Sequence, residues 1–310
     1  MTETILSLEG VTKRYSGQAA VSGFDLAVNR GQITGFLGPN GAGKTTSLRI
    51  ALGIIKPDDG KVRLFGQYPK AAILQRVGFL PEERGIYKKM KAEDVIIFFG
   101  RMKGMTMTAA RKAARDGLER FGLGGEARKK IKEMSKGMAQ KVQIIATLAH
   151  DPEFIILDEP FSGLDPVNQK MLEEMIRDEA KRGKTILFST HVMEHAERLC
   201  DQIVLISKGR KVFDGGLPQA LSQVPRRVVI ETASDHDLRQ VLGALGAVEA
   251  QTAPEGLKGW TIELAAGSDA QDVLKACVEG GVRLARFEPM RAHLHDAFVE
   301  LVETSNREAV

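Results

Sequence analysis

One nine-residue segment constrains this chain more than any other. Residues 38–46 (Gly-Pro-Asn-Gly-Ala-Gly-Lys-Thr-Thr) follow the apolar segment Ile33–Leu37, which reads as a short buried strand, and lead into a predicted helix at 47–52. Such a turn points successive backbone N–H groups at a polyphosphate, and the positive end of the helix dipole strengthens the anion site. The alternative is a glycine-rich turn that binds nothing, which the complete G-x-x-x-x-G-K-T pattern in this context disfavours.

Side chains of this loop carry further expectations. Lys44 is expected to reach the β- and γ-phosphates of ATP and to act catalytically there, and the Thr45 hydroxyl is expected to ligate Mg²⁺. The residues expected to bind the nucleotide are Gly38, Pro39, Asn40, Gly41, Ala42, Gly43, Lys44, Thr45 and Thr46.

Composition limits the setting in which this site works. The 310 residues include 44 basic and 40 acidic side chains, which nearly balance and leave a net charge of only +4. The chain is therefore not polybasic, and no nucleic-acid partner is expected. Two cysteines form no disulfide framework and suit a reducing cytosol. The N-terminus lacks a signal-peptide pattern. The longest apolar run, Val95–Phe99, falls far short of the ~20 residues that span a bilayer, so a membrane role requires a partner.

Two further strands are predicted to end beside the phosphate loop. The apolar run 154–157 reads as a strand of a parallel sheet and ends at Asp158 and Glu159. Carboxyl ends of such strands face the ligand crevice, so Asp158 is expected to hold Mg²⁺ and Glu159 to polarise the attacking water. His191 ends the next apolar strand, 185–190, and is predicted to lie near the γ-phosphate; a purely structural histidine is the alternative.

Three weaker signals lie elsewhere. Tyr15 precedes the turn Ser16-Gly17 and is either a surface aromatic or a face on which adenine stacks. Ser135 is predicted to cap a helix that runs to His150. The start of that helix is a second possible anion-binding site, although most serines at this position cap the helix without binding a ligand. Glu82, in a polar loop after a predicted strand at 77–80, is on local pattern alone a solvated charge.

Taken in order, these motifs resemble the ATPase subunit of an ABC transporter over about residues 5–218. The corresponding segments are Tyr15 as the A-loop aromatic, 38–46 as Walker A, Pro81-Glu82 as the Q-loop, Ser135–Met138 as the signature, Asp158 and Glu159 as Walker B, Ser162–Asp165 as the D-loop and His191 as the switch histidine. The resemblance implies that Ser135, Gly137 and Asp165 also bind nucleotide.

Two positions depart from the family pattern. The usual Q-loop glutamine is Glu82, which is expected to reach Mg²⁺ or the water and so to act as metal ligand and catalytic residue. The last signature residue is Met138, without the amide of the usual glutamine. Both departures resemble exporter ATPases of the ABC-2 type, related to those for sodium extrusion and drug resistance, and thus favour export.

The resemblance also predicts the fold and the partners. We expect an α/β chain with a P-loop RecA-like ABC ATPase core, an antiparallel β subdomain and a helical subdomain over residues 1–220. A small C-terminal α+β domain of ferredoxin-like type is expected over 221–310, because strand and helix patterns alternate there. Two ATPase subunits, identical or closely paralogous, would sandwich ATP and Mg²⁺ and dock on separate transmembrane permease subunits at the cytoplasmic face of the cell membrane.

Two other functions remain open at this point. A soluble mechanochemical ABC ATPase is disfavoured because the chain has one cassette and no long heptad arms. A regulatory module that binds ATP without hydrolysing it is disfavoured because Glu159 and His191 are both present.

Overall fold

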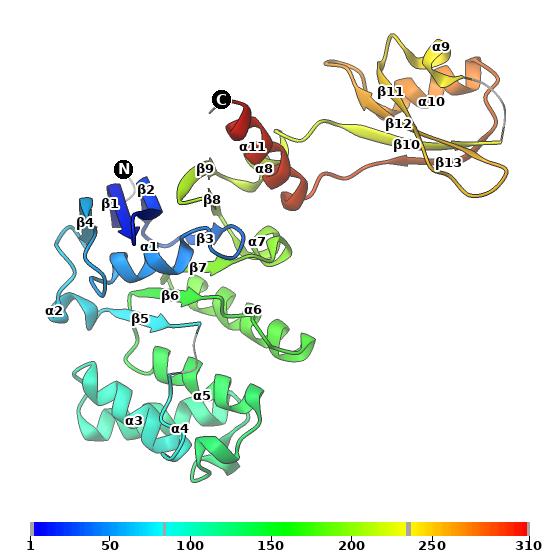
Figure 1. Cartoon of the computed structure of the whole chain (residues 1–310). Coiled ribbons are helices and arrows are strands. Elements are labelled where there is room, and N and C mark those ends of the chain that lie inside the picture. The colour runs from blue at the N-terminus through cyan, green and yellow to red at the C-terminus, as the bar shows by residue number, and fades with distance from the viewer. Residues whose placement is uncertain (1–2, 83–84, 234–236, 309–310) are drawn as a thin grey trace. The chain divides into compact units, whose positions relative to one another are not determined.

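The computed structural model describes residues 3–82, 85–233 and 237–308, the last four by their backbone alone. These residues form two compact units, Met1–Leu217 and Pro218–Val310 (Figure 1). The domain boundary that the sequence places after residue 220 stays a prediction. Each unit is described separately.

A six-stranded sheet forms the centre of the first unit. Its strands, in spatial order, are β5 (Val77–Leu80), β6 (Phe154–Asp158), β7 (Thr185–Thr190), β3 (Ile33–Leu37), β8 (Gln202–Ser207) and β9 (Arg210–Gly215). All neighbours are parallel except β9, which forms an antiparallel hairpin with β8. Every residue of β3, β6 and β7 is buried, as expected for continuous apolar strands inside a parallel sheet.

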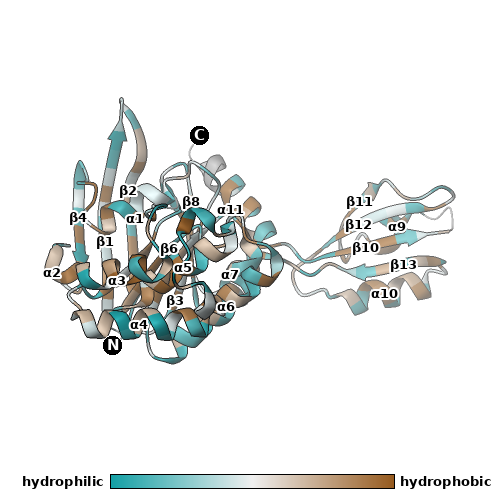
Figure 2. Cartoon of the chain, turned by 90° about the horizontal axis from the view of Figure 1, so that it is seen from below, coloured by the Kyte–Doolittle hydropathy of each residue, from teal (hydrophilic) through white to brown (hydrophobic). Residues whose placement is uncertain are grey.

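A second, antiparallel sheet has the order β2 (Gln18–Asn29), β1 (Thr4–Tyr15) and β4 (Asp59–Leu64). Helix α1 (Lys44–Ala51) contributes Leu48 and Ile50 to a core shared with both sheets. In that core, Phe24 of β2 and Phe36 of β3 lie with ring centroids 5.5 Å apart. Figure 2 shows apolar residues gathered on these inner strands. Helices α6 (Pro166–Lys181) and α7 (Met193–Leu199) pack on the central sheet as well.

Between β5 and β6 the chain forms a helical subdomain. It consists of α3 (Ala92–Met102), α4 (Met107–Arg120) and α5 (Lys136–Leu148), with short 3-10 turns at Gly124–Glu126 and Ile131–Glu133. A further short helix, α2 (Ala71–Leu74), precedes β5. Ser135 caps α5, since its Oγ accepts a hydrogen bond from the Met138 N–H at 3.2 Å, which confirms the predicted helix start.

After the short helix α8 (Leu217–Leu221), the second unit has the element order β10 (Arg227–Thr232), α9 (Leu238–Leu242), β11 (Gly246–Gln251), β12 (Lys258–Leu264), α10 (Ala270–Glu279) and β13 (Leu284–Pro289), followed by α11 (Leu294–Glu308). Its antiparallel sheet has the order β11-β12-β10-β13. A βαββαβ chain with this strand order is ferredoxin-like, so the predicted fold class is confirmed for both units. Strand β11 was not predicted.

Within the described ranges, no helix combines the length and apolar character needed to cross a bilayer.

Candidate functional site

Close backbone packing explains the glycines of the phosphate-binding loop. A Cβ on Gly38 would lie 2.2 Å from the carbonyl oxygen of Ile206 in β8. Gly43 has a φ of +107°, and a Cβ there would lie 2.5 Å from the carbonyl oxygen of Ala20 in β2. Because no side chain fits at either position, the loop is held tightly against both sheets just before α1 begins at Lys44.

Lys44 folds back over the loop. Its side chain is 6% exposed, and its Nζ donates hydrogen bonds to the carbonyl oxygens of Gly38 at 2.7 Å and Pro39 at 3.2 Å. The same Nζ lies 3.2 Å from Glu159 Oε1. The phosphate loop is therefore joined to the carboxyl end of β6 by a buried ion pair.

Asp158 is bound by two hydroxyl groups. Ser189 Oγ donates to Asp158 Oδ1 at 2.5 Å, and Thr45 Oγ1 donates to the same oxygen at 3.3 Å. Burial raises the pKa of Asp158, while these two hydrogen bonds act in the opposite direction. Carboxylate and hydroxyl oxygens of this kind are ligands that Mg²⁺ prefers. Ser189 was not predicted as a site residue. The only sequence signal for it was a serine near the end of an otherwise apolar strand, and the structure places it opposite Asp158 in the β6–β7 register.

Glu159 has a strained backbone. Its φ of +46° lies in the left-handed region, which non-glycine residues rarely adopt. The turn is held because the Glu159 N–H donates hydrogen bonds to the carbonyl oxygen of Ser189 at 3.2 Å and to its Oγ at 3.1 Å. His191 Nδ1 lies 3.0 Å from Glu159 Oε2, whereas among the described residues the buried Oε1 has only the ion pair with Lys44. A hollow of 460 Å³ adjoins Glu159 and His191.

Tyr15 and Glu82 lie outside this network of contacts. Tyr15 ends β1 and is 47% exposed, with Lys13 Nζ 5.7 Å from its ring centroid. It belongs to the β1–β2 pair whose Ala20 carbonyl contacts the phosphate loop. Glu82 is exposed and follows β5, whose last residue is in register with β6. In the part of the chain that the structure describes, no hydrogen bond or ion pair joins Glu82 to Asp158, whose side-chain partners are Thr45 and Ser189.

The signature residues lie at the first turn of α5, away from the phosphate loop's contacts. A Cβ on Gly137 would lie 3.0 Å from Asn168 Nδ2 at the start of α6. Asp165 caps α6 by accepting bonds from the Asn168 N–H at 3.0 Å and from Asn168 Nδ2 at 2.6 Å. The Asn168 backbone bond holds the pKa of Asp165 below its usual range. Among the described residues, no hydrogen bond joins Ser135 to the phosphate loop of its own chain.

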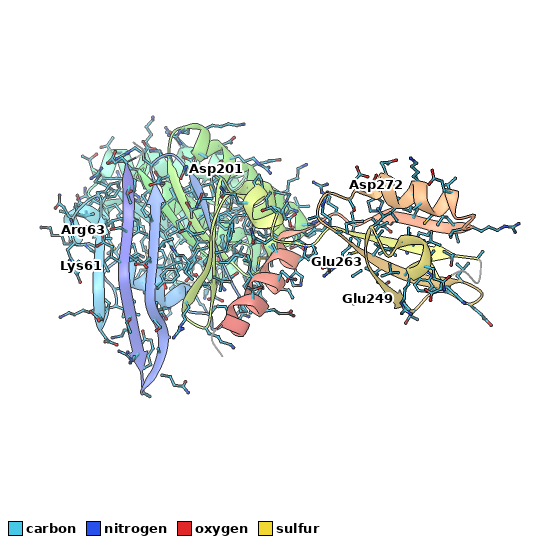
Figure 3. All side chains as sticks on the ribbon, turned by 90° about the horizontal axis from the view of Figure 1, so that it is seen from above. Lys61, Arg63, Asp201, Glu249, Glu263 and Asp272 are labelled. Carbon is cyan, nitrogen blue, oxygen red and sulfur yellow. The ribbon has the colours of Figure 1, made fainter. Side chains whose placement is uncertain are left out.

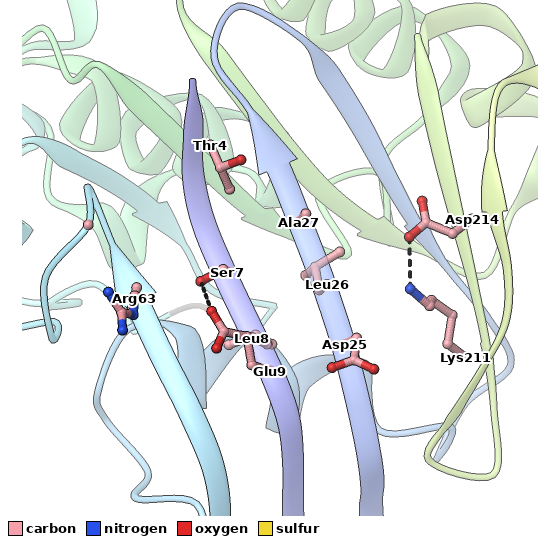
Figure 4. Close-up of a pocket in the computed structure, with 11 residues that line it drawn as sticks. Thr4, Ser7, Leu8, Glu9, Asp25, Leu26, Ala27, Arg63, Lys211 and Asp214 are labelled. Carbon is pink, nitrogen blue, oxygen red and sulfur yellow. Dashed lines mark hydrogen bonds and ion pairs between the residues drawn. The ribbon is translucent and has the colours of Figure 1, made fainter. Parts of the chain in front are cut away.

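A separate hollow of 520 Å³ lies on the open face of the antiparallel sheet (Figure 4). Its lining includes Glu9 and Arg63, together with the ion pair between Lys211 and Asp214 at 2.9 Å. Lys61 and Arg63 of β4 point to the outside of that sheet (Figure 3). None of the predicted site residues lines this hollow. It is therefore distinct from the candidate site.

Lysine, two carboxylates and a histidine thus converge on a phosphate loop at the carboxyl edge of a parallel sheet. With a helical insertion and an antiparallel β subdomain around it, this arrangement defines a P-loop ATPase of the ABC class. The sequence profile described as ABC transporter matches residues 21–162. The chain is 38% identical over 298 residues to an uncharacterized ABC transporter ATP-binding protein of Bacillus subtilis (strain 168), covering 96% of this chain and 98% of that one.

Other comparisons agree. A Nod factor export ATP-binding protein I of Burkholderia orbicola (strain AU 1054) is 39% identical over 224 residues, covering 71% of this chain and 73% of that one. A solved ATP-binding subunit of an ABC transporter has a TM-score of 0.66 at 28% identity, covering 71% of this chain and 93% of that one. The chain belongs to the family of ABC transporter ATP-binding proteins, and it is an ATPase that powers transport. A mechanochemical ATPase unconnected to transport is not favoured.

Proposed function

We propose that this chain powers export as one of two ATPase subunits docked on separate transmembrane permease subunits at the cytoplasmic face of the cell membrane. The observation that carries the proposal is the convergence of the buried Lys44 and Glu159 with the partly exposed His191 beside Asp158. Export is supported by the similarity to a Nod factor export ATP-binding protein and by the departures at positions 82 and 138.

The cluster fits MgATP. The N–H groups of the loop and of the first turn of α1 would bind the phosphates, with Lys44 leaving its loop carbonyls for the β- and γ-phosphates. Thr45, Asp158 and Glu82 would hold Mg²⁺, and a bound Mg²⁺ neutralises charge on the phosphate oxygens. Tyr15 remains open on one face, which suits stacking on adenine.

Glu159 is proposed as the general base. Its Oε1 is buried and, among the described residues, is paired only with Lys44 Nζ, so once Lys44 moves to the phosphates this oxygen can accept the proton of the attacking water. His191 keeps the other carboxylate oxygen in place at 3.0 Å and thereby orients the base. The strained backbone at Glu159, fixed by Ser189, supports this role, because such strain is concentrated at functional sites.

The signature residues are proposed to complete the site of a second subunit. Ser135 and Gly137 form the start of a helix, which attracts anions, yet Gly137 lies against Asn168 of its own chain. Such a helix start is available to nucleotide bound by another copy or a close paralogue. Asp165, next to it at the start of α6, would lie at the same interface.

A groove of 490 Å³ supports permease docking. It lies between β5 and helices α2, α3 and α5, and Phe79, Ile86, Phe99 and Met102 contribute to its mostly apolar lining. Met102 is 64% exposed, which leaves it available to a partner. We expect Met102→Asp to reduce co-purification with the permease, while Met107→Asp, an exposed methionine outside the groove, should not.

Mixing two inactive variants tests the shared site. Glu159→Gln should bind ATP and accumulate ATP-dependent dimers that hardly hydrolyse, whereas Ser135→Arg should bind ATP as a monomer and fail to close. In a mixed dimer, the Walker residues of the Ser135→Arg chain meet the signature of the Glu159→Gln chain, so one site is intact. Regained ATPase activity on mixing is the expected result. No regained activity, together with no ATP-dependent dimer of Glu159→Gln alone, would refute the proposal.

A further inference from the structure

A glutamine of the signature helix contacts the loop that carries the general base. Gln140 lies on α5, five residues after Ser135, and is 7% exposed. Its Nε2 donates a 2.7 Å hydrogen bond to the carbonyl oxygen of Pro160, the residue directly after Glu159. This bond joins the helical subdomain to the end of the central sheet within a single chain.

The bond completes the anchoring of a strained turn. The Glu159 N–H is held by Ser189, and the Glu159 carbonyl accepts from the Ser162 N–H at 3.1 Å. The Pro160 carbonyl is the next backbone acceptor, and Gln140 supplies its donor. Because Glu159 has a left-handed backbone, the turn depends on such bonds to keep the carboxylate where it lies. Because Pro160 is buried, loss of the Gln140 donor would remove a hydrogen bond from a buried carbonyl oxygen, which is energetically costly.

A second contact lies one turn earlier on the same helix. The close approach of Gly137 to Asn168, whose side chain binds Asp165, places the first turn of α5 directly against the first turn of α6. Pro160, near the start of the segment from Glu159 to Asp165, is therefore bonded to α5 directly, and Asp165 at its end is linked to α5 through Asn168. A shift of α5 would act on this segment at both places.

We propose that Gln140 is a positioning residue that ties the placement of Glu159 to the placement of the signature helix in the same chain. This inference rests on the proposed function, in which the signature end of α5 contacts nucleotide held by the second subunit. The Gln140 bond holds the turn at Glu159 against α5. Each subunit's base is thereby positioned by the signature helix of its own chain.

Comparing the effect of a substitution on kcat with its effect on ATP affinity separates a positioning role of Gln140 from a purely structural one. Gln140→Met keeps the size of the side chain and removes the donor. It should lower kcat about tenfold or more, equivalent to ~1.4 kcal/mol, while the ATP dissociation constant changes less than about twofold. Lys141→Met is the matched control, because it removes a bond from the next residue of α5 to the remote Phe121 carbonyl. Gln140→Leu, which is also apolar and without a donor, replaces the methionine variant if that variant does not fold.

Mixed dimers provide the decisive test. In the pair of Ser135→Arg and Glu159→Gln chains, the only intact site uses the base of the former and the signature of the latter. Adding Gln140→Met to the Ser135→Arg chain should slow ATP hydrolysis about tenfold, whereas adding it to the Glu159→Gln chain should change the rate less than about twofold. Slowing in neither arrangement, in both equally, or only in the second would overturn the inference. An inactive parental pair would instead contradict the shared site, and with it the inference.

Discussion

Replacing Glu159 by glutamine should tighten ATP binding as well as slow hydrolysis. Lys44 Nζ lies 3.2 Å from Glu159 Oε1, and both side chains are only 6% exposed. A charge-assisted contact at such a buried site contributes ~1.5–3 kcal/mol, which ATP must overcome to recruit the lysine. Lys44 keeps its bonds to Gly38 and Pro39, so we expect the lower end of that range. The dissociation constant of ATP should fall about tenfold, or ~1.4 kcal/mol.

The assay must separate this effect from dimer formation, which also tightens apparent binding. We therefore compare the ATP affinity of Ser135→Arg with that of Ser135→Arg/Glu159→Gln by calorimetry, since both should stay monomeric. Glu153→Gln, at the opposite end of β6, is the control and should leave the affinity unchanged. Hydrolysis by Glu159→Gln should fall ~10²–10⁴-fold through loss of the base. An unchanged or weaker ATP affinity in the double variant would refute the claim that the Lys44–Glu159 ion pair competes with ATP for Lys44.

Four further outcomes are expected. Tyr15→Ala should weaken ATP binding by ~1 kcal/mol and spare hydrolysis at saturation, whereas Tyr15→Phe should be near neutral; an unchanged dissociation constant for Tyr15→Ala would argue against stacking. Glu82→Gln should retain ATPase activity within about tenfold of the wild-type chain. A loss beyond about a hundredfold would indicate that the Glu82 carboxylate has a role that an amide cannot fill. A chain ending at Gln219 should fold and bind ATP, which a calorimetric titration checks. Hydrogen bonds from Arg76 lower the pKa of Glu153 from 4.5 to about 2. The stability it contributes is therefore fully present above pH 4.5 and is lost as the pH falls through about 2. Because the side chain is 41% exposed, Glu153→Gln should cost at most ~1 kcal/mol in urea unfolding at pH 7 and progressively less as the pH falls towards 2.

Local patterns were sufficient to predict most of the fold. Continuous apolar runs identified β3, β6 and β7, because strands buried on both faces leave no polar alternation. Strand β11 escaped prediction because Gly-Ala-Val-Glu-Ala-Gln has a single β-branched residue and lies at the edge of its sheet. Helix α1 begins at Lys44 rather than Ser47, because the phosphate loop itself supplies the first turn.

The site was predicted less completely than the fold. Residues at strand ends, such as Asp158 and His191, were found because parallel strands end at one edge. Ser189 and Gln140 were missed, since their importance depends on contacts made across long sequence distances, 31 residues to Asp158 and 20 residues to Pro160. A buried polar side chain shows its partner only after the chain has folded.

The most direct test of the account measures ATP turnover per chain as a function of chain concentration, for the wild-type chain and Ser135→Arg side by side. If each site needs the signature of a second subunit, turnover by the wild-type chain should fall on dilution. Ser135→Arg should stay inactive at every concentration while still binding ATP through the loop that holds Lys44. Full turnover by Ser135→Arg, equal to that of the wild-type chain and independent of concentration, would contradict a site shared between two subunits.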